Sequence, residues 1–150
     1  MNRAFVLAVL STALLACGSN SSVDAPTAGA SAQVDFLLTP SGTAAPNLGA
    51  NASTYPLRRE LVLTARDNAG MERVVTGVQL TSTAAGAAMS FDLPSSGRIP
   101  AHGALAMVLT AFYTQALQGS EQTLTLVVTM TDASGRTESF TARDVLRLKL

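Results

Sequence analysis

The stretch TLTLVVTMTDASGRTESF, residues 123–140, decides the fold of this chain. In its first half, an apolar residue stands at every second position: Leu124, Leu126, Val128 and Met130. The residues between them are mostly threonine. A period of two is that of a β-strand with one buried face and one wetter face. The next four residues, Asp132-Ala133-Ser134-Gly135, place Asp first and Gly fourth, as in a type I turn. The stretch therefore predicts a strand that enters a hairpin.

The same alternation recurs along the chain from Arg59 onward. The further rows are Leu61, Leu63 and Ala65; Val74, Val78 and Leu80; Ala87, Met89, Phe91 and Leu93; and Leu146, Leu148 and Leu150. Between the first two rows, the run Asp67-Asn68-Ala69-Gly70 repeats the turn pattern, and it predicts a second hairpin.

Residues 104–118 fit two structures. One is a helix that Gly119 would end, because a helical period joins Leu105, Val108, Leu109, Phe112 and Ala116. Leu105, Met107, Leu109 and Ala111 follow a strand period equally well. The all-β surroundings favour a strand from about Leu105 to Tyr113.

The start of the domain also has two interpretations. Residues 33–54 contain the short apolar run Val34 to Leu38, followed by the polar stretch PSGTAAPNLGANAST. Either Val34 to Leu38 is a first strand followed by a long loop, or it belongs to the preceding linker. A structureless loop of this length is uncommon inside a compact domain.

Several short strands with turn signals indicate an all-β fold, an antiparallel two-sheet sandwich of about seven strands over residues 33–150. The paired strands and Asp-x-x-Gly turns, as in LVVTMTDASGRTESF, resemble the immunoglobulin-like or fibronectin type III-like domains of bacterial envelope proteins. The resemblance spans roughly residues 55–150, without the cysteine pair and core tryptophan of antibody-type domains.

The N-terminus has the pattern of an export signal. Arg3 precedes a thirteen-residue apolar run at positions 4–16. As a helix this run would measure roughly 20 Å, shorter than the roughly 30 Å hydrocarbon core of a bilayer. Residues 1–16 are therefore predicted to be a signal peptide rather than a membrane span.

The end of that run, Leu14-Leu15-Ala16-Cys17-Gly18, resembles the bacterial lipobox. The resemblance implies cleavage between Ala16 and Cys17 and a diacylglycerol on the Cys17 sulfur. Because two or three acyl chains hold a protein to a bilayer far better than one, the membrane would be a partner through this covalent lipid. Gly18 stands where the inner-membrane retention signal usually has Asp, which favours the outer membrane. Residues 17–32, rich in Gly, Ser, Ala and Pro, are predicted to be the lipidated cysteine and a flexible linker.

Composition excludes several classes of function. Ten basic residues balance ten acidic ones, so the chain lacks the positive field that attracts nucleic acid. His102 is the single histidine, which argues against a Ser/His/Asp triad or an imidazole metal site, and we expect an ordinary loop histidine. Asp67, Asp132 and Asp144 lack the close acidic spacing of calcium loops. We therefore expect no enzyme, no metal, no cofactor and no small-molecule substrate.

The remaining candidates are charged and aromatic side chains. The basic residues Arg58, Arg59, Arg143, Arg147 and Lys149 are expected to be solvated and to protect strand edges. Three aromatic residues could form a binding platform: Tyr55, Phe112 and Tyr113. For Phe112 and Tyr113 the alternative is a role as core and corner residues.

These observations predict a lipid-anchored protein of the cell envelope, held to the outer membrane on its periplasmic or surface face. Its domain would be a non-catalytic module that binds another envelope protein or supports an assembly. The alternative is a carbohydrate-binding module for an envelope glycan, although such modules usually stack sugars on Trp or Tyr and this chain has no Trp.

Overall fold

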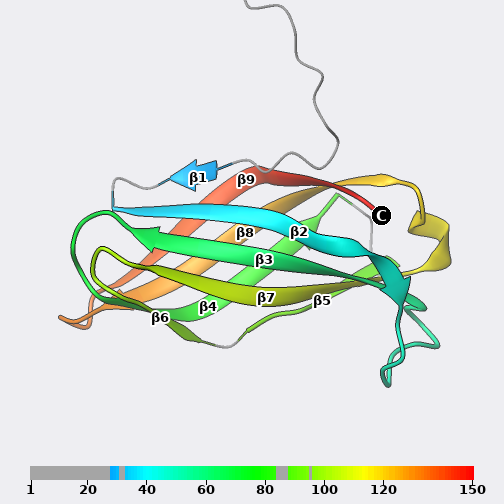
Figure 1. The fold of residues 1–150 in the computed structure, drawn as a ribbon, viewed down its shortest axis with the longest axis horizontal. Helices are drawn as coiled ribbons and strands as arrows, with labels where there is room; N and C mark the ends of the chain where they lie inside the picture. The colour runs from blue at the N-terminus through cyan, green and yellow to red at the C-terminus, as the bar shows by residue number, and fades with distance from the viewer. Residues whose placement is uncertain (1–27, 31–32, 84–87, 95) are drawn as a thin grey trace, which may run out of the picture.

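Two antiparallel sheets face one another in the computed structural model, which describes residues 28–30, 33–83, 88–94 and 96–150 (Figure 1). The five-stranded sheet has the order β1-β2-β3-β7-β5, with the strands at Ala28–Ala30, Val34–Pro46, Leu57–Asp67, Ala104–Tyr113 and Met89–Asp92. The four-stranded sheet has the order β6-β4-β8-β9, with the strands at Gly97–Ile99, Arg73–Ser82, Glu121–Asp132 and Thr137–Lys149.

The strand order is that of an immunoglobulin-like sandwich. Strands β2-β3-β7-β5 follow the A-B-E-D order of a constant-type domain, and they face β4-β8-β9, which follow its C-F-G order. The three-residue strands β1 and β6 add one strand at an edge of each sheet. The predicted all-β, two-sheet sandwich is therefore confirmed, with seven main strands and two short ones among the described residues.

The core lies between the two sheets and is built from the alternating rows. Leu124, Leu126 and Val128 of β8 are fully buried, and so are Leu146 and Leu148 of β9. Across the core, the rings of Phe36 on β2 and Phe140 on β9 stack with their centroids 4.7 Å apart. Met89 and Phe91 pack at the margin of the core, whereas Ala87 of the same predicted row lies outside the described residues.

Residues 104–113 form a strand, as the all-β surroundings favoured. Strand β7 pairs with β3 on one side and with β5 on the other, and Met107, Leu109 and Ala111 point into the core. A 3-10 helix at Gln115–Leu117 follows. The two backbone partners of β7 decide between the strand and helix periods, which the apolar pattern alone could not do.

The predicted row Val74, Val78 and Leu80 is wrong at its first member. Val75 is fully buried, whereas Val74 is 37% exposed. The pairing of β4 with β8 shifts register between Val75 and Gly77, because a β-bulge inserts one extra residue there. Because of this extra residue, the inward-facing positions before the bulge are one residue out of step with those after it. Alternation counted back from Val78 therefore assigns Val74 to the core in place of Val75.

The Asp67–Gly70 turn is not a hairpin. It joins β3 of the five-stranded sheet to β4 of the four-stranded sheet, so the chain crosses from one layer to the other. By contrast, the Asp132–Gly135 turn does close a hairpin between β8 and β9, with Gly135 at φ 85°. The two turns share a sequence pattern, but only tertiary packing determines where the following strand goes.

The start of the domain is a real strand that is longer than predicted. Strand β2 continues from Val34 to Pro46, with a register irregularity between Ser41 and Ala45. The loop after it is fixed by buried Asn47, whose Nδ2 donates to Asn51 Oδ1 at 2.8 Å and to the Tyr55 carbonyl at 2.7 Å. These bonds give the polar stretch an ordered structure that its composition did not indicate.

Strand β1 lies within the segment that composition assigned to the linker of residues 17–32. Ala28, Gly29 and Ala30 pair with Leu37, Phe36 and Asp35 of β2. Figure 1 shows β1 beside β9 at the edge of the sandwich. Backbone pairing needs no apolar side chain, so hydrophobic patterning could not indicate this strand.

Candidate functional site

An apolar patch lies on the outer surface of the five-stranded sheet. Two neighbouring rows across the sheet, one joining Leu37, Thr64 and Ala106 and the other Thr39, Val62 and Val108, contain no charge. Val108 is 61% exposed and Leu37 is 37% exposed. We name Leu37, Val62, Ala106 and Val108 the outer apolar face.

A hollow of about 470 Å³ adjoins one end of the outer apolar face. Its lining comes from β2, β3 and the first residue of β7: Asp35, Phe36, Leu37, Thr64, Arg66 and Ala104. Asp35 and Arg66 are direct register partners, so one acidic and one basic residue share the lining. The hollow thus combines apolar walls with no net charge.

The outer surface of the four-stranded sheet has a different character. It consists largely of hydroxyl-bearing residues: Thr76, Thr81, Thr125, Thr129, Thr131, Thr137, Ser139 and Thr141. Several of these hydroxyls bond one another or the backbone; for example, Thr131 and Thr137 lie 3.0 Å apart between their Oγ1 atoms. Because these contacts use hydrogen-bonding capacity within the sheet, the outer apolar face is the stronger candidate for contact with a partner.

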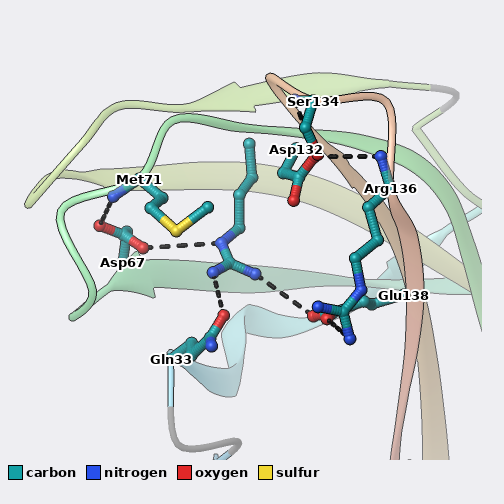
Figure 2. A network of polar contacts seen from close by, with 8 residues as sticks. Gln33, Asp67, Met71, Asp132, Ser134, Arg136 and Glu138 are labelled. Atoms are coloured by element: carbon teal, nitrogen blue, oxygen red, sulfur yellow. Dashed lines mark hydrogen bonds and ion pairs between the residues drawn. The ribbon is translucent and has the colours of Figure 1, made fainter.

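Arg73 is a buried charge that the sequence did not single out. It is 3% exposed, and its Nε lies 3.6 Å from Oδ1 of Asp67, whose side chain is fully buried. Its Nη1 lies 3.5 Å from Glu138 Oε2, and its Nη2 donates to Gln33 Oε1. Figure 2 shows Asp67, Gln33 and Glu138 around this guanidinium. The network joins both sheets to the residue that precedes β2, which indicates a structural role.

Asp67 also organises the loops at this end of the sandwich. Its Oδ2 accepts backbone hydrogen bonds from Met71 and His102, both at 3.0 Å. Burial by itself raises the pKa of this carboxyl. Hydrogen bonds from the backbone N–H groups of His102, Met71, Ala69 and Gly70 together lower it by more, so the net pKa lies below the ordinary value. The carboxylate is therefore held in its charged form.

The predicted polar candidates take part in the loops and turns in which they lie. His102 lies in the exposed loop before β7 with a φ of 54°, and its backbone rather than its ring binds Asp67. Asp132 Oδ1 accepts from the backbone of Ser134 and Arg136, as a turn residue does. Among the described residues, no three His, Cys, Asp or Glu side chains could hold a metal ion. The side chain of Asp144 lies outside the part of the chain that the structure describes.

The basic candidates divide into two groups. Arg58, Arg143, Arg147 and Lys149 are exposed, as predicted. The last three lie on the edge strand β9, but Arg58 lies on β3, which has a partner strand on each side, so the predicted edge position is wrong for Arg58. Arg59 differs: it is half-buried in the inward-facing row of β3, and its Nη1 donates to the Lys149 carbonyl of β9. The prediction of a solvated edge residue is wrong for Arg59, because its long side chain bridges the two sheets near their margin.

The aromatic candidates do not form an exposed platform. Tyr113 is fully buried, and its hydroxyl has no hydrogen-bond partner among the described residues. Burial raises the pKa of its phenol, and the nearby charge of Arg59 partly offsets that effect. Tyr55 and Phe112 are half-buried. The predicted core role is therefore confirmed for Tyr113, whereas Phe112 lies in the outward-facing row of β7.

The proposed modification site, Ala16 and Cys17, lies outside the described residues, so lipidation stays a prediction. Within the described part of the chain, no helix has the length and apolar character needed to cross a membrane.

Comparison with known proteins gives matches among solved structures alone. No family model and no curated protein matches the chain. A FixG-related protein from Vibrio parahaemolyticus aligns at 11% identity and a TM-score of 0.44, covering 77% of this chain and 98% of that one. The GAE domain of GGA2p from Saccharomyces cerevisiae aligns at 13% identity and a TM-score of 0.48, covering 84% and 97%. The yeast GGA1 GAE domain aligns at 10% identity and a TM-score of 0.44, covering 79% of this chain and 98% of that one. The fold assignment rests on the strand order described above.

Proposed function

We propose that this chain is a lipid-anchored protein of the bacterial envelope, attached through Cys17, and that its sandwich binds another envelope protein through the outer apolar face. It acts as a non-catalytic module. The outer membrane is the proposed site of attachment, with the domain on its periplasmic or surface side.

The observation that carries the binding role is the exposure of Val108 and Leu37 in two uncharged rows of one sheet. Contiguous exposed apolar patches mark interaction sites when polar residues surround them. Charged residues flank the rows here: Asp35 and Arg66 lie at one end and Glu60 at the other. An apolar centre with a polar rim is the usual composition of a protein interface.

The anchor is supported by the sequence Leu14-Leu15-Ala16-Cys17 at the end of an apolar run. The glycan alternative gains no support, because Tyr113 is buried and the chain has no Trp. Sugar stacking needs exposed aromatic rings.

The binding role is tested with a photo-crosslinking amino acid at Val108 in the full chain, irradiated in intact cells. We expect a discrete adduct with another protein, because Val108 is the most exposed large apolar residue of the outer apolar face. The same amino acid at Gln79, which is exposed on the outer surface of the four-stranded sheet, is the matched control.

A protein adduct at Val108 with little at Gln79 supports the proposal. Equal capture at both positions, or no protein adduct at Val108, contradicts it.

A further inference from the structure

We infer that the hollow beside β1 receives one acyl chain of the lipid on Cys17 of the same molecule. The inference rests on the proposed function, because it requires lipid at Cys17. The hollow would then be a binding site whose ligand is an alkyl chain of the same molecule, at one end of the outer apolar face that binds a protein.

The size and walls of the hollow fit a hydrocarbon chain. Its volume of about 470 Å³ falls within the roughly 300–1,000 Å³ of sites that bury small ligands. Leu37 and Ala104 give the lining apolar surface on two strands, and Thr64 lies between them on β3. An alkyl chain placed there would lose contact with water, as would the exposed part of Leu37.

The charges at the hollow favour a neutral ligand over an anionic one. Asp35 and Arg66 lie opposite each other in register, so their charges offset. The Asp35 carboxylate already accepts a hydrogen bond from Asn68 Nδ2 at 2.7 Å. An acidic headgroup would meet this carboxylate, whereas an alkyl chain brings no charge to it.

The position of β1 places the start of the described N-terminal segment beside the hollow. The three β2 residues in the lining, Asp35, Phe36 and Leu37, are the three that pair with β1. Ala28, the first residue of β1, lies opposite Leu37. Cys17 precedes Ala28 by eleven residues (28 − 17), and a Gly/Ser-rich segment of that length has a root-mean-square span of roughly 18 Å. The acyl chains can therefore reach the hollow from the side on which the chain enters the domain.

Occupation of the hollow would shield one acyl chain while the protein is outside a bilayer. In the anchored state the same chain would lie in the membrane, and the hollow would be open. The site would thus reduce exposure of the lipid to water during transfer to the membrane.

The test uses the full chain, produced in a bacterial host fed a photoactivatable 16-carbon fatty acid, extracted from the membrane and freed of detergent, so that it is irradiated outside a bilayer. After irradiation, the protein is digested and the crosslinked peptides are identified by mass spectrometry. We expect label on Cys17 and crosslinks from the acyl chain to peptides that contain Leu37, Arg66 or Ala104. In the variant Ala104→Glu, these crosslinks should fall at least fivefold, because the new carboxylate enters the lining.

Thr125→Glu is the matched control, since Thr125 lies on the outer surface of the other sheet. It should leave the crosslinks unchanged, and both variants should retain the urea midpoint of the parent because they alter outward-facing positions.

The outcomes separate the two proposals. Label on Cys17 without crosslinks to the hollow, or crosslinks unaffected by Ala104→Glu, overturns this inference and leaves the anchor intact. Absence of label on Cys17 overturns both.

Discussion

Arg73 carries a positive charge in a place that water hardly reaches, at 3% exposure. Removing a charge from water costs several kcal/mol unless opposite charges and hydrogen bonds compensate. Asp67 and Glu138 supply the opposite charges, and Gln33 accepts a hydrogen bond. At the residue scale, loss of one of these partners would leave part of the buried charge of Arg73 uncompensated.

The two Asp-x-x-Gly turns offer a direct comparison at this scale. Asp67→Asn removes the charge that faces Arg73 and should lower the free energy of unfolding by about 3 kcal/mol. Asp132→Asn should have a much smaller effect, because the Asp132 carboxylate accepts hydrogen bonds from Ser134 and Arg136 within its own surface turn. Urea unfolding at neutral pH measures both. Equal losses for the two variants would contradict the structural role assigned to Arg73.

The same pair predicts a dependence on pH. The pKa of Asp67 in the folded chain lies below its ordinary value of 3.8, so the folded state binds its proton less readily than the unfolded state. The stabilisation is therefore complete above the ordinary pKa and is lost as the pH falls through the folded-state value. The difference in urea midpoint between the parent and Asp67→Asn should be constant near neutral pH and should shrink below about pH 4. A difference that grows on acidification would contradict this assignment.

At the element scale, the β-bulge in β4 decides which valine belongs to the core. Val75→Ala should lower the free energy of unfolding by about 2 kcal/mol, because Val75 is fully buried. Val74→Ala should change it by less than about 0.5 kcal/mol, because Val74 faces outward. Urea unfolding of the two variants checks the register. A larger loss at Val74 would show that β4 runs without the bulge.

The elements also show how much the sequence could predict. The rows on β8 and β9 were predicted correctly, because each alternates without interruption within its own strand. The register shift between the two strands at Leu124 and Leu126 was not predicted. The bulge at Val75 and the crossing after Asp67 were not predicted, since both depend on the partner strand rather than on local pattern.

The candidate site was harder to predict than the strands. Val62 and Val108 sit at the wetter positions of their strands, where alternation leads one to expect polar residues. Their register places them side by side on neighbouring strands, and no period within either segment reveals that pairing. Arg73 was missed for a similar reason, because its partners come from three other parts of the chain.

In the whole molecule, the two sheets present different outer surfaces: one has an uncharged apolar centre flanked by charged residues, and the other is rich in hydroxyl groups. Val108→Glu should leave the free energy of unfolding within about 0.5 kcal/mol of the parent, because the side chain points to solvent. It should abolish the protein adduct formed by a crosslinking residue at neighbouring Val62. Urea unfolding and crosslinking in cells measure the two effects. Retained capture by the Val108→Glu variant would argue against the outer apolar face as the interface.

The proposed membrane attachment requires that the mature chain begin at a lipidated Cys17. The direct measurement is mass spectrometry of the N-terminal peptide of the full-length protein, purified from the membrane fraction of a bacterial host. We predict a peptide that begins at Cys17 and carries a diacylglycerol on sulfur. A peptide that begins at Met1, or any mature peptide with an unmodified Cys17 thiol, would contradict the proposed attachment to the envelope.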